Sequence, residues 1–276
     1  MRSAIVAMAF VAVISAVSGR ALAAPEAVEI HNGQFTLKAT MFKPDGPGPF
    51  PAVVGLHSCE GLNNTSGVLS SRYRDWADRL NKAGFVLLFP DSYGSRNMGN
   101  QCRTRSNVRT DRERMEDAQA ARQWLQTQSF VKPDHIALVG WSNGGIGVLW
   151  TVRPRARIQD NKPDFRSAVA FYPGCRRLDT AAWAARIPTL ILIGSADDVV
   201  SSRACEQMVN GARGRSARVQ IIVYPGAYHD FDHPNRAFQQ RTGYTFSTDG
   251  TGKVHSGTNP AARADVLRRV PQWLAR

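Results

Sequence analysis

Short apolar runs recur along the chain, and the segments between them carry apolar residues at helical spacing. The runs are rich in Val, Ile, Leu and Phe, as buried β-strands are. The first run alternates apolar and polar residues, which is typical of a strand with one exposed face. We predict strands over residues 35–42, 51–57, 85–89, 136–139, 167–172, 187–193 and 219–224.

The segments between these runs predict helices. Residues 71–83 place Tyr73, Trp76 and Leu80 on one face and are followed by Gly84, a common residue at helix ends. A second helix, with acidic residues in its first turn, is expected over 111–128. Two more are expected, over 144–152 and 261–274. Strands that alternate with helices favour an α/β fold, with a mostly parallel sheet and helices on both faces.

The first 23 residues differ in composition from the rest. A basic start precedes an apolar stretch, and Ala21-Leu22-Ala23 matches the cleavage pattern of secretory signal peptides. We therefore expect cleavage after Ala23 and one mature domain over 24–276, located in the periplasm or secreted. An uncleaved membrane anchor is the alternative, although the stretch is short for a span. No later segment is long and apolar enough to cross a membrane.

The chain is strongly basic. Its formal net charge is +13, and loss of Arg2 and Arg20 with the signal peptide leaves 33 basic and 22 acidic residues, a charge of +11. A surface of this charge attracts anions. No nucleic-acid-binding motif is present in the sequence. We therefore expect no nucleic-acid partner and interpret the charge first as an aid to solubility.

All four cysteines lie in the predicted mature domain, and an even number in an exported protein predicts disulfides. We favour Cys175 with Cys205, because each follows a strand end on the side of the sheet where loops gather. Cys59 with Cys102 is the complement, and the two other pairings stay open. The chain has no C-x-x-C and no paired Cys/His spacing, so we expect no metal and no cofactor.

The pentapeptide Gly140-Trp141-Ser142-Asn143-Gly144 has the G-x-S-x-G pattern. It lies between the apolar run 136–139 and a glycine-rich segment that can begin a helix. This strand-turn-helix context is the one in which a sharp turn exposes a nucleophilic serine. The motif therefore predicts acyl transfer through a covalent intermediate on Ser142.

The last two predicted strands each end in a loop that carries a candidate partner for this serine. Asp197 follows the first of them, with Asp198 as its rival, and His229 follows the second. His233 and His255 compete with His229 for the role of base. The order serine, acid, histidine is that of the α/β-hydrolase triad. Ligands of such sheets bind outside the carboxyl ends of the strands, where all three candidates fall.

These residue types suit nucleophilic catalysis. A serine hydroxyl needs a neutral imidazole to accept its proton, and His229 is the candidate. Asp197 would hold that ring in the useful tautomer. A developing oxyanion needs two N–H donors. We expect one from the backbone of Asn143 and the other from Cys59, with Ser58 as the alternative to Cys59.

Three further residues are possible substrate contacts. Arg96 and Arg103 lie in the irregular stretch 94–110 and could bind a substrate carboxylate, although arginines in loops are commonly solvated. His57 ends a buried strand, where it could form a pocket wall or serve as a hydrogen-bonded structural histidine.

Four segments around these residues resemble the dienelactone hydrolase family within the α/β-hydrolases, over about residues 28–274. They are LHSCEGL at 56–62, GWSNGG at 140–145, GSADDVV at 194–200 and YPGAYHDF at 224–231. The resemblance implies an α/β-hydrolase fold, with Asp197 as acid, His229 as base and the Cys59 amide as an oxyanion donor. The namesake enzymes carry a cysteine at the position of Ser142, so the serine favours ordinary ester hydrolysis.

The sequence thus predicts an exported serine hydrolase that cleaves a small-molecule carboxylic ester or lactone. A serine peptidase or amidase on the same triad is one alternative, and a catalytically silent binding protein is another. The patterns do not indicate the acyl or alcohol preference or the oligomeric state.

Overall fold

The computed structural model describes residues 24–276 apart from 34, 105–106, 157–159 and 180–181. Its centre is an eight-stranded sheet in the order β1-β2-β4-β3-β5-β6-β7-β8. β2 is antiparallel to both of its neighbours, and the strands from β4 to β8 in this order run parallel. The predicted, mostly parallel sheet is therefore confirmed. The strands are β1 Glu26–Asn32, β2 Phe35–Phe42, β3 Phe50–Leu56, β4 Val86–Pro90, β5 Val131–Trp141, β6 Ala168–Phe171, β7 Thr189–Gly194 and β8 Val219–Tyr224.

The predicted strands agree with β2 to β8 to within two residues at each end, except at the start of β5. That strand begins at Val131, where it pairs with Phe50. Its next three residues, Lys132, Pro133 and Asp134, are exposed, so no apolar run marks them in the sequence. β1 was not predicted, because Ile30 is its single buried residue. This strand forms the edge of the sheet, where little of it contacts the core.

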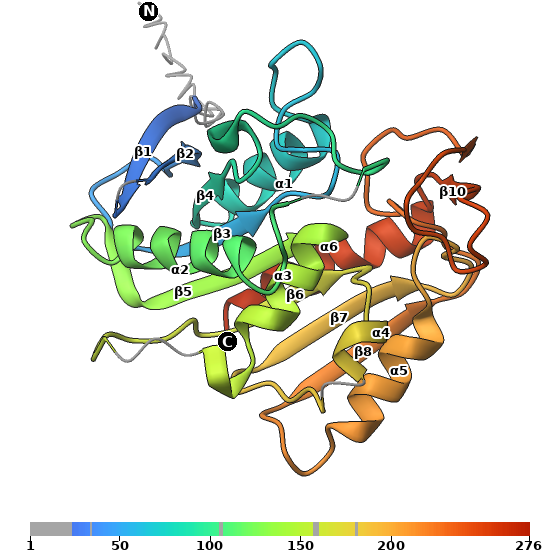
Figure 1. The fold of residues 1–276 in the computed structure, drawn as a ribbon. Coiled ribbons are helices and arrows are strands. Elements are labelled where there is room, and N and C mark those ends of the chain that lie inside the picture. Colours follow the sequence, from blue (N-terminus) through green and yellow to red (C-terminus); the bar gives the residue numbers. More distant parts are fainter. Residues whose placement is uncertain (1–23, 34, 105–106, 157–159, 180–181) are drawn as a thin grey trace, which may run out of the picture.

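Helices cover both faces of the sheet, as predicted. In Figure 1, α2 and α3 lie in front of the sheet and α6 lies behind it. α1 shares the rear face with α6, because Arg263 of α6 donates to Asp75 of α1 at 2.7 Å. The longer helices are α1 Ser71–Lys82, α2 Glu113–Leu125, α3 Asn143–Thr151, α5 Ser202–Gly211 and α6 Pro260–Leu274.

α2 is shorter than the predicted helix at both ends. Its carboxyl end gives way to a turn in which the Val131 N–H donates to the Gln128 carbonyl at 3.0 Å, and this turn starts β5. The helix α5 was not predicted, and neither were several short elements. They are the helix α4 Arg176–Asp179, the 3₁₀ turns η1 Gly94–Arg96 and η2 Pro154–Ala156, and the hairpin of β9 Gln239–Arg241 with β10 Val254–Ser256.

Aromatic rings fill the core beside the carboxyl ends of β5 and β6. Trp141 stacks on Phe171 with ring centroids 5.5 Å apart, and Trp76 of α1 packs against Phe171 at 5.3 Å. The indole N–H groups of Trp76 and Trp141 donate to Asp232 at 2.7 and 2.8 Å, so these buried donors are satisfied. Because Trp141 is the last residue of β5, this packing fixes the position of Ser142, which follows it.

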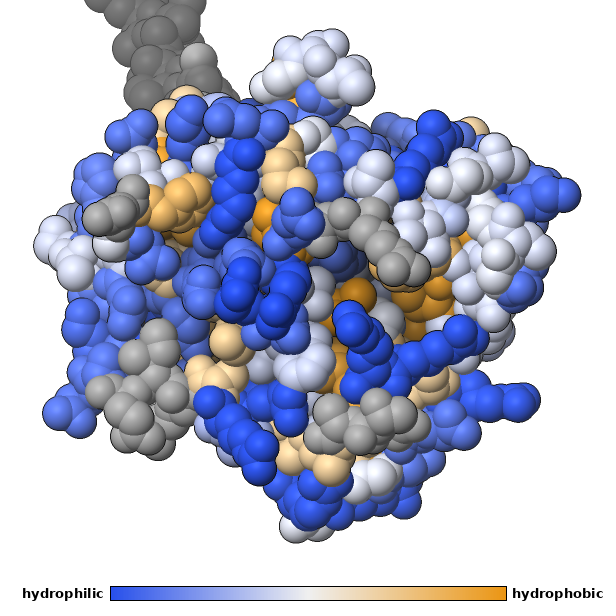
Figure 2. Space-filling view, viewed as in Figure 1, coloured by the Kyte–Doolittle hydropathy of each residue, from blue (hydrophilic) through white to orange (hydrophobic). Residues whose placement is uncertain are grey.

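Two disulfides link segments that are distant in the sequence, Cys175 to Cys205 and Cys59 to Cys102, which is the pairing that we favoured. The predicted signal peptide, residues 1–23, lies outside the described residues. Within the described part of the chain, no helix combines the length and hydrophobicity needed to span a membrane. On the face shown in Figure 2, hydrophilic residues predominate and apolar residues form separate patches.

Candidate active site

Ser142 occupies a strained turn between β5 and α3. Its φ of 52° and ψ of −112° lie outside the common regions for an L-residue. Neighbouring glycines make the turn possible. A Cβ on Gly140 would lie 2.4 Å from the Gly144 carbonyl oxygen, and a Cβ on Gly144 would lie 2.0 Å from the Leu56 carbonyl oxygen. The three fixed positions of the motif therefore each have a steric or conformational reason.

Ser142, His229 and Asp197 form a continuous hydrogen-bonded chain. The Ser142 Oγ is 2.9 Å from His229 Nε2, and His229 Nδ1 is 2.7 Å from Asp197 Oδ2. All three residues are buried. The second oxygen of Asp197, Oδ1, accepts the backbone N–H groups of Val199 and Val200 at 3.0 Å. The loop that carries Asp197 therefore orients its carboxylate independently of the contact with the histidine.

The environment of His229 favours its protonated form relative to an ordinary histidine. Burial lowers the pKa of His229, but the charge of Asp197 and the hydrogen bond to it outweigh burial, so the net pKa is raised. The ring packs against Tyr172 with centroids 4.5 Å apart. The His229 carbonyl accepts the Gly257 N–H at 3.1 Å, which ties its loop to the segment after β10.

The rival residues named from the sequence have other partners. Asp198 Oδ2 is 2.6 Å from His255 Nδ1, so these two residues form a second pair beside the first. His233 Nε2 is 3.3 Å from the Ser71 hydroxyl. Burial and two nearby arginines, Arg72 and Arg236, lower the pKa of His233 to about 4.

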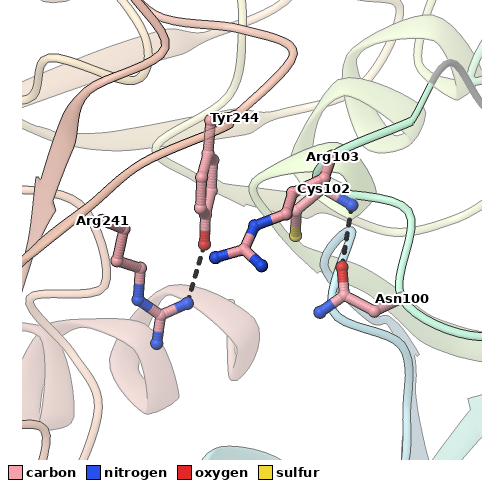
Figure 3. Close-up of a pocket in the computed structure, with 5 residues that line it drawn as sticks. All are labelled: Asn100, Cys102, Arg103, Arg241 and Tyr244. Atoms are coloured by element: carbon pink, nitrogen blue, oxygen red, sulfur yellow. Dashed lines mark hydrogen bonds between the residues drawn. The ribbon is translucent and has the colours of Figure 1, made fainter.

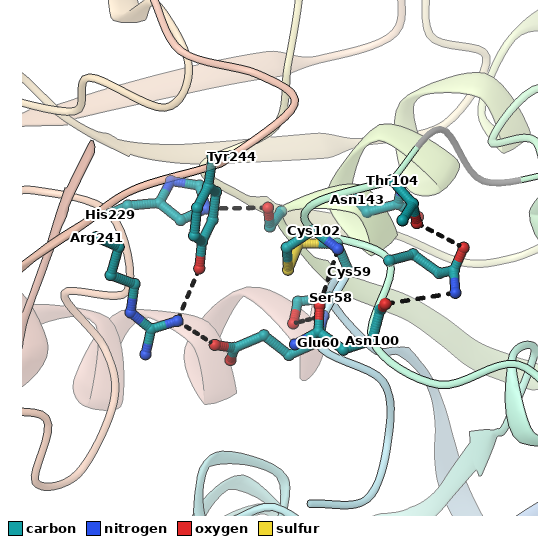
Figure 4. The surroundings of a disulfide bond; sticks show 12 residues. Ser58, Cys59, Glu60, Asn100, Cys102, Thr104, Asn143, His229, Arg241 and Tyr244 are labelled. Carbon is teal, nitrogen blue, oxygen red and sulfur yellow. Dashed lines mark hydrogen bonds and ion pairs between the residues drawn. A yellow bond between two sulfur atoms is a disulfide. The ribbon is translucent and has the colours of Figure 1, made fainter. Parts of the chain in front are cut away.

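The two expected oxyanion donors lie in adjoining segments. The first turn of α3 approaches the end of β3 so closely that a Cβ on Gly144 would touch the carbonyls of Leu56 and His57. The Ser58 N–H already donates to the Tyr73 hydroxyl at 2.7 Å, which makes it a poor oxyanion donor. Cys59, the next residue, is therefore the better candidate. Figure 4 shows Ser58, Cys59 and Asn143 in the surroundings of His229.

Side-chain contacts hold both donor segments in place. The Tyr93 hydroxyl donates to the Asn143 side-chain oxygen at 3.0 Å. The Cys59 carbonyl accepts the Gln101 N–H at 2.7 Å. Beneath the same loop, the buried guanidinium of Arg114 donates to the His57 carbonyl. These bonds anchor the Asn143 side chain and the loop that carries Cys59.

The structure places His57 in the interior and not at the cavity described below. Its ring is fully buried, with Nδ1 2.8 Å from the Ser58 carbonyl and Nε2 2.9 Å from Arg114 Nη1. Burial and the Arg114 charge hold the pKa of His57 well below its usual value, so the ring is neutral. Of the two roles expected for His57, a pocket wall or a hydrogen-bonded structural histidine, these contacts fit the second.

Arg96 also faces a protein partner. Its Nη1 and Nη2 donate to the two carboxylate oxygens of Asp117 at 2.8 and 2.9 Å, a bidentate pair. Its guanidinium lies 4.3 Å from the centre of the Phe35 ring. The structure therefore does not bring Arg96 together with the serine, histidine and aspartate.

A cavity of about 320 Å³ adjoins the Cys59 loop. Figure 3 shows the residues that line it, which are Asn100, Cys102, Arg103, Arg241 and Tyr244. Arg241 Nη1 donates to the Tyr244 hydroxyl at 2.7 Å and to Glu60 Oε1 at 2.6 Å. Because Glu60 is the neighbour of Cys59, this ion pair joins the cavity wall to the proposed oxyanion loop.

A partly buried charge network supports the same region. Glu60 Oε2 pairs with Arg236 Nη2 at 3.1 Å, and Arg236 in turn pairs with Asp230, which also binds Arg72. Burial raises the pKa of Asp230, but the two arginine charges outweigh burial and hold it far below its usual value. The network therefore ties the loop of Glu60 to the residue that follows His229.

No sequence pattern predicted Arg241, Tyr244 or this network. Arg241 and Tyr244 lie in 235–258, a stretch without hydrophobic periodicity. Their positions depend on contacts with Glu60 and Cys102, far away in the chain. The polar stretch after His229 and Asp230 was the one feature of the sequence that could have pointed to these residues. Among the described residues, no cluster of three His, Cys, Asp or Glu is placed to hold a metal ion.

Comparison with known proteins agrees with this architecture. The chain is similar to a "Probable 2-oxo-3-(5-oxofuran-2-ylidene)propanoate lactonase" of Bradyrhizobium sp., with 26% identity over 216 residues, 72% of this chain and 80% of that protein. A crystal structure of a dienelactone hydrolase from Anabaena variabilis has a TM-score of 0.62 and 17% identity, and it covers 92% of this chain and 98% of its own.

Esterase 2 of Thermogutta terrifontis, in a structure phosphorylated by paraoxon, has a TM-score of 0.64 and 18% identity, with 91% of this chain and 93% of that chain covered. At these identities the likeness to solved structures shows the fold. The family is shown by a sequence model, described as "Dienelactone hydrolase family", that matches residues 37–276. The chain therefore belongs to the dienelactone hydrolase family.

Proposed function

We propose that the protein is a serine hydrolase that cleaves a carboxylic ester or lactone through an acyl-enzyme on Ser142. The observation that carries the proposal is the chain of hydrogen bonds from Ser142 through His229 to Asp197. It begins at a backbone-strained serine and ends at a carboxylate held by two N–H groups. Each member thus has the geometry that its role requires.

In this mechanism His229 Nε2 takes the proton from Ser142 as the Oγ attacks the ester carbonyl. The negative charge that forms on the carbonyl oxygen is met by the N–H groups of Asn143 and Cys59, and losing one such donor typically costs about 3 kcal/mol of barrier lowering. The imidazolium, stabilised by Asp197, then protonates the departing alkoxide. A water molecule repeats the sequence on the acyl-enzyme, releases the acid and restores the serine.

The lining of the cavity supports a substrate that carries a negative charge. Arg103 and Arg241 both line it, and Glu60 offsets part of the Arg241 charge. Guanidinium groups bind carboxylates in bidentate geometry. The name of the Bradyrhizobium relative, a propanoate lactonase, describes a lactone with such a group. We therefore propose a carboxylate-bearing ester or lactone as the substrate class.

We also propose that the mature protein works in the periplasm or outside the cell. Both disulfides are compatible with an oxidising compartment. The basic start, apolar stretch and Ala21-Leu22-Ala23 of the leader support export.

Labelling with a fluorophosphonate, followed by peptide mapping, tests the proposal. We expect stoichiometric modification of Ser142, and loss of both labelling and ester turnover in Ser142→Ala. Turnover that survives in Ser142→Ala would disprove the acyl-enzyme mechanism. A matched panel of esters, lactones and amides, each with and without a carboxylate, tests the substrate class. Preference for amides would point to a peptidase or amidase, and equal rates with neutral and anionic esters would remove the role of the arginines.

A further inference from the structure

We propose that the Cys59–Cys102 disulfide is a positioning element of the active site, which holds an oxyanion donor and the wall of the substrate cavity in one arrangement. The inference rests on the proposed function, because it assigns the bridge a part in that reaction. Figure 4 shows the bridge with Asn143 and His229 in its surroundings and with Arg241 and Tyr244 nearby. Its role would then extend beyond stability.

The bridge and one hydrogen bond beside it join three segments that are distant in the sequence. One sulfur belongs to Cys59, in the loop after β3 that carries the proposed donor. The other belongs to Cys102, which lines the cavity and precedes Arg103. The Cys102 carbonyl accepts the Thr245 N–H at 3.1 Å, so the segment that carries Arg241 and Tyr244 is attached to the same point.

Hydrogen bonds on either side of the bridge hold its two cysteines in position. The Gln101 N–H donates to the Cys59 carbonyl at 2.7 Å, beside the sulfur bridge. The Cys102 N–H donates to the Asn100 side-chain oxygen at 2.9 Å. Residues 97–104 form no helix or strand, so specific tethers of this kind set their position. A loop without secondary structure thereby acquires the precision that catalytic groups need.

The second disulfide provides a matched control. Cys175 precedes α4 and Cys205 lies within α5, so this bridge fastens two helical elements. Neither cysteine lines the cavity. The two bridges close segments of similar length, 43 and 30 residues, so their loss should destabilise the fold to similar extents. A difference in catalysis between the two losses would therefore report on position.

Loss of the Cys59–Cys102 bridge should have an effect that depends on the substrate. For a neutral ester, kcat should fall about 10- to 100-fold with a small change in KM, since a displaced N–H donor weakens mainly the transition state. For a carboxylate-bearing ester, KM should rise as well, because Arg103 moves with Cys102. The midpoint of the acid limb of the pH profile should not move, because the contacts of His229 with Asp197 are retained.

The experiment compares two double variants, Cys59→Ser/Cys102→Ser and Cys175→Ser/Cys205→Ser. We measure kcat and KM on a neutral and a carboxylate-bearing ester, well below each variant's melting temperature. The proposal expects both to melt earlier, with kcat lost in the first alone. It is overturned if the first variant keeps the wild-type kcat, or if both variants lose kcat equally.

A second measurement covers the case in which the first variant does not fold. Cys175→Ser/Cys205→Ser retains the Cys59–Cys102 bridge alone. A water-soluble phosphine and one water molecule reduce that bridge to two thiols, and the phosphine takes the oxygen of the water and becomes the phosphine oxide. The rate of Ser142 phosphonylation should fall as the free thiols appear. An unchanged rate on fully reduced, folded protein overturns the proposal. Failure of the proposed function looks different, because native oxidised protein would then resist labelling or Ser142→Ala would stay active.

Discussion

Two neighbouring carboxylates, Asp197 and Asp198, each bind the Nδ1 of a histidine, yet the two pairs have different surroundings. Asp197 and His229 are 2.7 Å apart with side chains 0% and 6% exposed. Asp198 and His255 are 2.6 Å apart with side chains 28% and 32% exposed. The distances are nearly equal. The pairs differ in burial and in what each histidine ring contacts besides its aspartate.

The far nitrogen of His229 meets the hydroxyl of Ser142, whereas the ring of His255 stacks on Phe238 with centroids 5.5 Å apart. Asp198 also accepts the backbone N–H of His255 at 2.8 Å, and its carbonyl accepts the Thr248 N–H at 2.7 Å. The outer pair therefore fastens the 235–258 segment to the domain. An aspartate-histidine hydrogen bond alone does not make a catalytic site, and a third group on a dry, rigid support is also needed.

Removing each histidine should separate the two pairs most strongly. We expect His229→Ala to lower kcat about 10⁴- to 10⁶-fold, because the serine loses its base. His255→Ala should change kcat by less than about tenfold, since no reacting atom contacts that ring in the proposed mechanism. Steady-state kinetics on one ester, with circular dichroism as the control for folding, decides between them. Equal losses would mean that the outer pair takes part in the chemistry.

Replacing each carboxylate by its amide sharpens the contrast. Asp197→Asn should lower kcat about 10⁴-fold, because an amide favours the wrong tautomer of His229 and does not stabilise its charged form. Asp198→Asn keeps an oxygen for the His255 N–H and should act mainly through KM, because the 235–258 segment carries Arg241. The split between kcat and KM on a carboxylate-bearing ester tests this. A large loss of kcat in Asp198→Asn would contradict it.

The pH dependence should report on the inner pair. The proposed mechanism needs neutral His229, and its pKa is raised above 6.5, so the rate should rise with pH through a limb centred above 6.5. Below that midpoint, kcat/KM should fall about tenfold per pH unit. The residual activity of Asp197→Asn should show a lower midpoint, because the charge that raises the pKa is gone. Asp198→Asn serves as the control, and a limb that moves equally in both variants would assign it to another group.

The smallest expected effect concerns stability. The Asp198–His255 pair is partly exposed, and pairs of that kind contribute up to about 1 kcal/mol to unfolding free energy. Urea unfolding of His255→Ala should therefore show a small loss, with an unchanged dependence on denaturant. A loss of several kcal/mol would mean that the pair holds more of the fold than the 235–258 segment.

Much of the fold was predictable because buried strands and helices carry apolar residues in regular patterns along the sequence. The strands β2 to β8 are apolar where they cross the core, and α1 carries its large side chains at helical spacing. β1 and the first residues of β5 were missed because exposed strands lack such a pattern. The candidates Ser142, Asp197 and His229 could be named because each follows a strand in a fixed order.

The rest of the site could not be predicted in this way. The proposed substrate cavity depends on Arg241, and this side chain is held by Glu60, 181 residues away. Arg114 is buried beneath the Cys59 loop, although an arginine on a predicted helix is ordinarily exposed. Such contacts join single residues that are distant in the sequence, so they produce no regular pattern along the chain.

By itself the sequence determined an α/β fold and a serine, an acid and a histidine at three strand ends, because strand periodicity and glycine sterics act locally. Tertiary structure alone decided which of two adjacent aspartates meets His229, that the Ser58 N–H is already used by Tyr73, and that Arg96 pairs with Asp117. The reason is physical. Hydrogen bonds and ion pairs are short-ranged and directional, so small differences in position select their partners, and those positions exist only once the chain has packed.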